Sequence, residues 1–346
     1  AALTLPTVAD TPAAILADYR KAATTATKRL NETLEKQGAL IVTSLTGKGD
    51  TANAQLLTEQ IKAKLAGEPI IAPVTDAKTL FAQYDGARAT AMKPVQADAI
   101  KRLDGLLKLA TMPEADIVLI AIVGTAGLQP ALAAIRAGKD IAIASKEILV
   151  MAGETVMNEA RKHGVKVLAV DSEHSAIFQC LDGKPPSSVR NLWLTASGGP
   201  FRDASRWPKD ALAMVTLQQA LKHPSWVMGR KITLDSATLF NKGLEMIEAR
   251  WLFDVEMARV RVVVHPQSVV HSMVEFIDGS TIAQASPPDM RLPIALGLSW
   301  PHRLADVSPR IDWSRAHMWE FFPLDVARFP SVPLAVAAGR AGGTHP

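Results

Sequence analysis

The fold is decided by residues 116–127, which read DIVLIAIVGTAG. After the leading Asp, the apolar run is typical of a strand buried on both faces of a parallel sheet. Gly124 and Gly127 then mark a strand-to-helix turn, and the helix that follows is expected to end near Gly138. The next apolar run, residues 141–144, predicts another strand. This alternation of strand and helix indicates an α/β fold with a parallel sheet.

The rest of the chain is interpreted outward from this unit. Upstream, the sequence predicts helices at residues 13–37, about 52–65 and 95–110, and strands at 38–44 and 69–74. Downstream it predicts strands at 165–170 and 192–195 and helical character over 239–253. Residues 261–265, 269–276 and 281–285 look like antiparallel strands, the last two joined by Asp278 and Gly279. Residues 200–230 are interpreted as a long, partly mobile loop, and loops of that length usually have a function.

Composition excludes several classes of protein. With 346 residues, of which 48% are hydrophobic and 21% charged, the chain resembles an ordinary globular protein of two or three domains. It contains no run of about 18 uncharged apolar residues, so no membrane span is expected, and its start does not read as a signal peptide. A single cysteine, Cys180, fits a reducing cytosol. A net charge of +4 with only 5% aromatic residues favours small anionic ligands over nucleic acid.

Two acidic segments suggest a metal site. VDSEH (residues 170–174) follows a predicted strand, and residues two apart at a strand end point the same way. The carboxylates of Asp171 and Glu173 would therefore repel each other unless a cation or proton lies between them. In NKGLE (residues 241–245), Asn241 and Glu245 share a helix face. Such oxygen ligands suit Mg²⁺ or Mn²⁺ beside a phosphate pocket, although a solvated strand end and an ordinary surface helix would give the same residues.

Further residues offer the chemistry that an anionic substrate and a nucleotide need. The backbone of the glycine turn at 124–127 could approach a phosphate or a nicotinamide, and the row SGG (197–199) could cradle an anion. A phosphate could be bound by hydroxyl, amide, ammonium and imidazole groups. A lysine that follows a strand could hold a substrate oxyanion or the 2′-phosphate of NADP. Two side chains of the 200–230 loop could close over a carbon skeleton. For each of them a structural role is the alternative. The candidates are Lys48, Lys146, Ser197, His223, Trp226, Met228, Ser236, Asn241, Lys242 and His271.

Several motifs occur in order along the chain. They are AIVG (121–124), ASKE (144–147), DSEH (171–174), SGGPF (197–201), HPSWVMGRK (223–231), DSAT (235–238), NKGLE (241–245) and HPQS (265–268). With this set, residues 116–303 closely resemble the 1-deoxy-D-xylulose 5-phosphate reductoisomerase family of the non-mevalonate isoprenoid pathway.

The resemblance implies roles for individual residues. The catalytic residues would be Lys146, Asp171, Glu173 and Glu245, and the last three of these would hold the metal ion. The substrate would contact Lys146, Ser172, Glu173, Ser197, His223, Trp226, Met228, Ser236, Asn241, Lys242, Glu245 and His271. Residues 197–230 would form a lid. NADPH would lie near Gly47, Lys48, Ala121, Ile122, Ser145, Glu147, Met228 and Gly229.

The resemblance also implies an activity and a domain plan. The activity would be an NADPH-dependent and Mg²⁺- or Mn²⁺-dependent reductive isomerisation of a small phosphorylated sugar by a homodimer, in a bacterial cytoplasm or a plastid. We expect an NADPH-binding Rossmann-like domain at 1–150, an α+β catalytic and dimerisation domain at 151–303, and a linker at 304–346 towards a C-terminal helical domain, which we expect to be missing. No nucleic acid or membrane partner is expected.

The chain departs from the family at its N-terminal end. The family's glycine-rich pyrophosphate loop should fall near residues 20–28, where this chain has no glycine. Side chains there would crowd a pyrophosphate. Two alternatives therefore stay open: a related NADP-dependent, metal-assisted oxidoreductase of another phosphorylated substrate, and a non-catalytic truncated homologue that binds metal and phosphate.

Overall fold

The computed structural model describes residues 12–66, 70, 73–122, 124–224 and 228–342. The chain divides into two compact units, residues 1–106 and 107–346. Each unit is described by itself. None of the described helices is both long and apolar enough to cross a bilayer.

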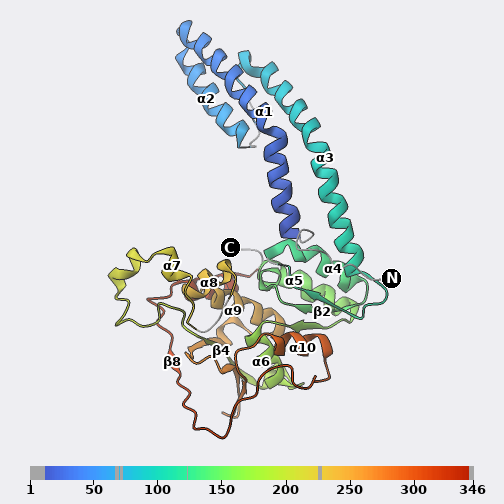
Figure 1. The fold of residues 1–346 in the computed structure, drawn as a ribbon, viewed down its shortest axis with the longest axis vertical. Helices are drawn as coiled ribbons and strands as arrows, with labels where there is room; N and C mark the ends of the chain where they lie inside the picture. Colours follow the sequence, from blue (N-terminus) through green and yellow to red (C-terminus); the bar gives the residue numbers. More distant parts are fainter. Residues whose placement is uncertain (1–11, 67–69, 71–72, 123, 225–227, 343–346) are drawn as a thin grey trace. The chain divides into compact units, whose positions relative to one another are not determined.

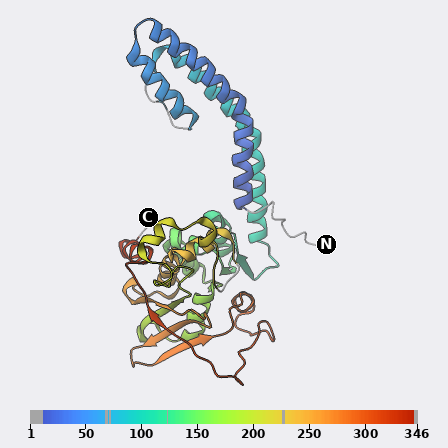
Figure 2. The same ribbon diagram turned by 60° about the vertical axis from the view of Figure 1, so that its left-hand side comes forward.

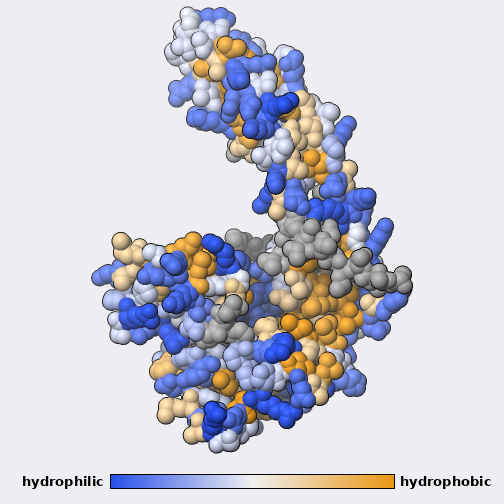
Figure 3. All heavy atoms as spheres, viewed as in Figure 1, coloured by the Kyte–Doolittle hydropathy of each residue, from blue (hydrophilic) through white to orange (hydrophobic). Residues whose placement is uncertain are grey.

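The first unit is helical where it is described. Its elements are α1 (Pro12–Gly47), α2 (Thr51–Leu65), the short 3-10 helix η2 (Thr75–Ala77) and the start of α3 (Lys78–Ala110). α2 folds back along α1, and α3 runs beside α1 (Figure 1, Figure 2). The face seen in Figure 3 mixes hydrophilic and hydrophobic residues. Apolar side chains at helical spacing form its core, and the most buried include Leu34, Leu45, Leu57, Phe81 and Tyr84.

The predicted strand at 38–44 is wrong, because these residues belong to α1. Leu34 and Leu45, on either side of this segment, are buried in the core between the helices, and Ile41 and Val42 pack against that core. Gly38 allows α2 to come close, since a Cβ there would lie 2.3 Å from Cδ1 of Ile61. Packing between helices thus overrides the β-propensity of the apolar run.

The second predicted strand of this region is not observed either. Residues 69, 71 and 72 lie outside the described part of the chain, while Ile70, Pro73 and Val74 have no strand structure. The helices predicted at 13–37, 52–65 and 95–110 are confirmed. The first continues to Gly47 as part of α1, and the last is the C-terminal half of α3, which begins at Lys78. Pro94 lies inside α3. Because proline disfavours the interior of a helix, the sequence pattern predicts a helix only from residue 95 onward.

The second unit begins with a parallel sheet of three strands in the order β1-β2-β3. In chain order the elements are β1 (Ile117–Ile120), η3 (Gly124–Gly127), α4 (Leu128–Arg136), β2 (Asp140–Ile143), α5 (Lys146–His163) and β3 (Val167–Ala169), so the α/β alternation predicted from residues 116–127 is confirmed. Gly127 is required by close packing, since a Cβ there would lie 2.9 Å from side-chain atoms of Ile120 and Ile148.

A mixed sheet of five strands follows, in the order β7-β6-β4-β5-β8. Its strands are β4 (Val189–Ala196), β5 (Val260–Val264), β6 (Val270–Phe276), β7 (Thr281–Ala285) and β8 (Phe322–Pro323). β6 and β7 are antiparallel, as predicted, but β5 pairs in parallel with β4 and antiparallel with β8. The prediction that β5 belongs to an antiparallel run is therefore wrong. The long helical crossover between β4 and β5 allows the parallel pairing.

The remaining helices connect and cover the two sheets. They are α6 (Ser172–Leu181), η4 (Pro186–Ser188), α7 (Leu217–Ala220), α8 (Arg230–Ala237), α9 (Phe240–Phe253), η6 (Met257–Arg259), α10 (Arg291–Ser299) and α11 (Ser331–Ala341). Residues 200–230, predicted as a loop, also contain the 3-10 helix η5 (Lys209–Met214) and α7. α9 packs against α5 on one side and α11 on the other. Its apolar residues Met246, Ala249 and Phe253 belong to the core beneath the mixed sheet.

Candidate metal and substrate site

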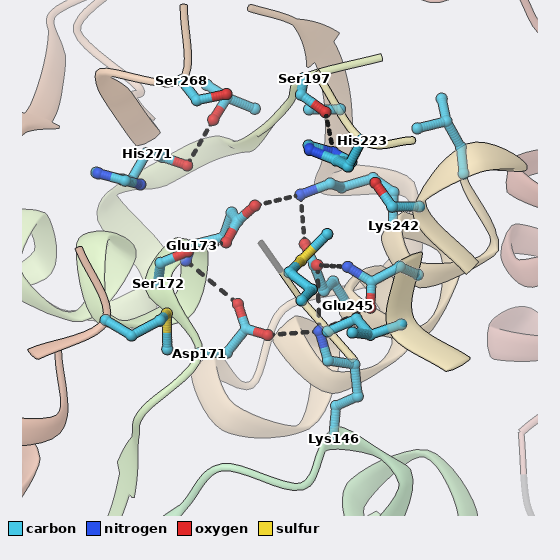
Figure 4. Close-up of a pocket in the computed structure, with 18 of the residues that line it drawn as sticks. Lys146, Asp171, Ser172, Glu173, Ser197, His223, Lys242, Glu245, Ser268 and His271 are labelled. Carbon is cyan, nitrogen blue, oxygen red and sulfur yellow. Dashed lines mark hydrogen bonds and ion pairs between the residues drawn. The ribbon is translucent and has the colours of Figure 1, made fainter. Parts of the chain in front are cut away.

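The predicted site residues meet where β2, β3 and β4 end. α5 begins at Lys146 just after β2, α6 begins at Ser172 just after β3, and Ser197 follows β4. Ligands of such sheets bind at the carboxyl ends of the strands. These residues enclose a cavity of about 240 Å³ (Figure 4). The predicted residues that line it are Lys146, Asp171, Ser172, Glu173, Ser197, His223, Met228, Ser236, Asn241, Lys242, Glu245 and His271.

Three carboxylates form the acidic centre of the cavity. Asp171 is the N-cap of α6, where its side chain accepts a hydrogen bond from the backbone N–H of Glu173 at 3.3 Å. One oxygen each of Asp171, Glu173 and Glu245 lies within 4.8 Å of the other two. An all-oxygen set of this kind is typical of a site for Mg²⁺ or Mn²⁺. The two segments that the sequence singled out are thus brought together.

Two lysines compensate these carboxylates. The ammonium nitrogen of Lys146 lies 2.5 Å from Asp171 and 3.2 Å from Glu245. Lys242 lies 2.7 Å from Glu173 and also contacts the second oxygen of Glu245 (Figure 4). Asn241 donates a hydrogen bond to Glu245 and accepts one from Lys146 at 3.0 Å. The three carboxylates and two ammonium groups leave the cluster with one negative charge, and this favours a further cation.

Burial and charge act against each other in this cluster. Burial alone would raise the pKa of Asp171, but Lys146 and His174 hold it well below the usual range of a carboxyl. Burial and the neighbouring Glu173 raise the pKa of Glu245, although both lysines oppose the shift. Burial would lower the pKa of Lys146, yet the carboxylates around it raise that pKa well above its ordinary value. The lysines therefore stay charged, and so does Asp171.

The other end of the cavity offers groups that suit a phosphate. The hydroxyl of Ser197 lies 3.1 Å from Nε2 of His223, and the backbone N–H of Gly199 donates to the same hydroxyl. Gly199 has a φ of +64°, and a Cβ there would lie 2.7 Å from the backbone oxygen of Ser236. Glycine thus lets the end of β4 approach α8, so that Ser197 and Ser236 line one cavity.

Two histidines of the site have lowered pKa values, which favours the uncharged form of each imidazole. Burial lowers the pKa of His223, and the nearby Arg202 lowers it further. Burial also lowers the pKa of His271, whose Nε2 lies 3.1 Å from the backbone oxygen of Ser286. Met228 lines the cavity, as predicted for a lid residue, whereas the predicted Trp226 lies outside the described residues.

Four of the residues predicted to lie near NADPH border the end of β1 and the start of α5. Ser145 donates to the backbone oxygen of Gly124 at 2.9 Å and to Glu147 at 3.1 Å. Glu147 also pairs with Lys231 at 2.7 Å, two residues after Gly229, the N-cap of α8. Gly124 has a φ of +77° and open space where a Cβ would be. Ala121 and Ile122 directly follow β1, so these residues border an open strand-end turn.

Gly47 and Lys48 differ from the other predicted cofactor residues. Gly47 ends α1, and Lys48 lies in the turn before α2, in the helical unit. Their assignment assumed a strand before them, and that strand is not there. The residues near 20–28, where the family's glycine-rich loop would fall, lie inside α1.

Several residues of the site were not predicted from the sequence. Ser268 has a φ of +52° between β5 and β6, and no pattern in the sequence marks that backbone state. Behind the carboxylates lie the fully buried His174 and Glu248. Helical spacing could have found Glu248, which is three residues after Glu245 on α9. The further lining residues that were not singled out are Ala144, Val170, Thr195, Ala196, Ile232, Leu239, Ser268 and Met290.

Family models match most of the chain. The model described as 1-deoxy-D-xylulose 5-phosphate reductoisomerase matches residues 27–153. A model of the C-terminal domain of that enzyme matches residues 167–253, and a DXP reductoisomerase C-terminal domain model matches 285–346. The first match begins inside α1, well before the residues on which the resemblance in the sequence rested. The last covers the segment that was expected to be a linker.

Named relatives agree with these matches. A 1-deoxy-D-xylulose 5-phosphate reductoisomerase of Gloeobacter violaceus is 47% identical over 88% of this chain and 75% of its own length. A chloroplastic one of Oryza sativa is 48% identical over 85% of this chain and 61% of its own. A solved DOX-P reductoisomerase with NADPH, fosmidomycin and magnesium has a TM-score of 0.65 at 44% identity, over 69% of this chain and 60% of that one. The Zymomonas mobilis enzyme with NADPH has a TM-score of 0.64 at 45% identity, over 70% and 62%. The chain thus spans between about three fifths and three quarters of these proteins.

Proposed function

Because this chain belongs to the 1-deoxy-D-xylulose 5-phosphate reductoisomerase family, we propose that it catalyses the reaction for which the family is named. It would convert 1-deoxy-D-xylulose 5-phosphate into 2-C-methyl-D-erythritol 4-phosphate by rearrangement of the carbon skeleton and reduction with NADPH. One observation supports this most: Asp171, Glu173 and Glu245 meet at one end of a cavity whose other end carries Ser197 and His223.

The residues fit a hard divalent cation. Asp171, Glu173 and Glu245 would hold Mg²⁺ or Mn²⁺, which would supply Lewis acidity at the ketone and hydroxyl oxygens of the substrate. A cation bound to these carboxylates would release Lys146 and Lys242 from their present ion pairs. Both ammonium groups would then be available to the substrate, whose phosphate is anionic. Metal and substrate should therefore bind more tightly together than separately.

The other side chains bind and orient the substrate. Ser197, His223, Ser236, Asn241 and Lys242 would hold the phosphate, the part of the substrate that does not react. Remote binding of this kind supplies energy that positions the reacting part of a substrate. Lys146 and Ser172 would contact the oxygenated carbons, and His271 would support the wall of the pocket. Closure of residues 197–230, with Met228 and Trp226 over the substrate, would exclude water.

The nicotinamide end of the cofactor fits the strand-end turn. NADPH would supply a hydride to the aldehyde that the rearrangement yields. Ala121, Ile122, Ser145 and Glu147 border the open turn at Gly124, and Met228 and Gly229 would contact the cofactor from the lid. Gly47 and Lys48 stay candidates for the other end of the cofactor on the resemblance alone.

A second candidate function is a homologue that binds metal and phosphate but not NADPH. It is favoured by the helical structure of residues 20–28, where a glycine-rich phosphate loop was expected. The two candidates differ in a titration of NADPH fluorescence with Mn²⁺ present. Saturable binding in the micromolar range, together with NADPH oxidation on addition of 1-deoxy-D-xylulose 5-phosphate, would support the reductoisomerase. Metal-dependent substrate binding without NADPH binding would support the second candidate.

The substitution Ser197→Ala tests the substrate end separately. It should raise KM for the phosphorylated substrate and leave NADPH affinity unchanged, because Ser197 borders only the anion end of the cavity. A normal KM would contradict the assignment of the phosphate. Two further expectations accompany the proposal: a homodimer formed through the mixed sheet, which sedimentation analysis can test, and a reducing compartment such as a bacterial cytoplasm or a plastid.

A further inference from the structure

Behind the carboxylate site lies a pair of buried ionisable residues that does not line the cavity. His174 is on α6, and Glu248 is on α9, one turn beyond Glu245. Both have no exposed surface, and neither borders the cavity. They therefore cannot touch a substrate in the described arrangement. A buried carboxylate is costly unless something compensates it, so its presence here calls for a physical reason.

The imidazole of His174 touches both segments that carry the metal ligands. Its Nε2 lies 2.8 Å from the backbone oxygen of Glu245, and since a carbonyl only accepts, this nitrogen carries a proton. Its Nδ1 lies 3.4 Å from Oδ1 of Asp171 and 3.5 Å from Oε2 of Glu248. The ring also lies parallel to Phe253 at 6.3 Å, which fixes its plane from the apolar side.

The carboxylate of Glu248 depends on His174 for compensation. Both of its oxygens lack a hydrogen-bond partner among the described residues, and so does Nδ1 of His174. The basic group that faces it is the imidazole, whose Nδ1 lies 3.5 Å from Oε2 of Glu248. Glu248 thus packs against the imidazole from α9, and the imidazole in turn lies against Asp171 and against the backbone at Glu245.

The two oxygens of Asp171 have different partners. Oδ2 contacts Lys146, on the cavity side, whereas Oδ1 faces His174 and accepts from the N–H of Glu173. A cation that took the place of Lys146 beside Asp171 would leave the contacts of Oδ1 with His174 and with the N–H of Glu173 available. His174 can therefore hold Asp171 in the same orientation with and without metal, in the way that outer partners orient metal ligands elsewhere.

We propose that Glu248 and His174 form a positioning pair, which fixes Asp171 on α6 and Glu245 on α9 at the spacing that one divalent cation requires. The inference rests on the proposed function, because it concerns the same metal site. The pair acts through the ligands and not on the substrate. Its loss should therefore weaken binding of the cation and leave binding at the phosphate end of the cavity unchanged.

The test is a titration of the purified full-length chain with Mn²⁺, in which free Mn²⁺ is measured by electron paramagnetic resonance without substrate or NADPH. Glu248→Gln keeps the shape of the side chain and removes its charge. It should weaken Mn²⁺ binding roughly 10–100-fold, as loss of outer-shell partners does elsewhere. At saturating Mn²⁺ its KM for 1-deoxy-D-xylulose 5-phosphate should equal that of the wild type.

A matched control is Glu159→Gln on α5, which removes a carboxylate paired with Arg136 outside the site. It should bind Mn²⁺ as the wild type does. Thermal unfolding followed by circular dichroism checks that each variant folds. If Glu248→Gln does not fold, Glu248→Asp serves instead, since it keeps the charge and withdraws it from His174, and it too should bind Mn²⁺ more weakly than the wild type.

The outcomes separate this inference from the proposed function. Wild-type affinity in the folded Glu248 variant would refute the positioning pair and leave the metal site standing. Wild-type affinity in Glu245→Gln, or no saturable binding by the wild type, would refute the metal site and both proposals with it. Weakened Mn²⁺ binding together with a raised KM at saturating metal would also count against the pair, since it would indicate general distortion of the cavity.

Discussion

The two units of this chain bury different kinds of residue. Among the described residues of the helical unit, the buried polar side chains are Thr27 and Gln60, and neither is charged. In the second unit, two lysines and two glutamates of the site are buried together with His174. Charged side chains are almost never fully buried without partners, because their burial costs free energy. Such a cluster therefore indicates a functional site, where the fold retains charged groups that destabilise it. The described residues of the helical unit include no buried cluster of charged side chains.

The largest effect should follow from Glu245→Gln in the second unit. Glu245 contacts Lys146, Lys242 and Asn241 and supplies one of the three carboxylates. Metal-dependent turnover should fall by more than the roughly 10–100-fold that loss of an outer-shell partner costs. Steady-state kinetics with Mn²⁺ measures it, and Glu59→Gln on α2 is the control. Near-normal turnover of Glu245→Gln would mean that the buried charged cluster of the second unit has no role in the reaction.

Metal binding should stabilise only the second unit. At a Mn²⁺ concentration of 100 times Kd, the free energy of unfolding should rise by about 2.7 kcal/mol. Hydrogen exchange followed by mass spectrometry should show slower exchange in α6 and α9, which carry the carboxylates, and no change in α1 or α2. Equal protection of both units would mean that the helical unit takes part in the site.

Two matched glycine substitutions should differ in cost between the units. A Cβ on Gly153 would lie 2.3 Å from the rigid ring of Trp251, so Gly153→Ala should cost about 1–3 kcal/mol through overpacking. A Cβ on Gly38 would lie at the same distance from Cδ1 of Ile61 and 3.1 Å from its Cγ1, and the far end of that side chain can turn away. Gly38→Ala should change stability by less than about 1 kcal/mol, because alanine also favours a helix. Urea denaturation measures both, and a reversed order would contradict the packing described for the two units.

A small effect, confined to the helical unit, is expected from Tyr84→Phe. The hydroxyl of Tyr84 donates to Asn31 at 2.7 Å and joins α3 to α1. Its loss should cost about 1 kcal/mol, as measured by thermal unfolding, with unchanged Mn²⁺ affinity. A change in Mn²⁺ affinity would show that the stability of the helical unit and the metal site are coupled.

The sequence predicted the second unit better than the first, for physical reasons. In residues 116–170, apolar runs between glycine turns have one stable solution, a buried parallel sheet, and the acidic residues at the strand ends then meet by topology. In residues 38–44 the same kind of run is equally compatible with a helix, and only the contact of Gly38 with Ile61 and of Leu34 and Leu45 with the core decides it. Local pattern cannot contain that information.

The site shows the same division. Asp171, Glu173 and Glu245 could be found because their spacing has a chemical meaning. The two lysines were expected to bind substrate, but their pairing with all three carboxylates depends on side-chain directions that spacing does not give. Ser268 depends on a backbone state that leaves no mark in the sequence. Helical spacing places Glu248 near Glu245 on α9, but it does not show which residues lie behind that face of the helix.

One helix face described above has a consequence for engineering. A Cβ on Gly243, which lies between Lys242 and Glu245, would come within 2.8 Å of Cβ of Ala335 on α11. The helix that presents the carboxylate and the ammonium group is thus fixed from its opposite side by a helix that never reaches the cavity. A sensor domain fused to α11 could make the site respond to an added signal. A small displacement of α11 would shift α9 through the contact of Ala335 with Gly243, and α9 carries Glu245 and Lys242.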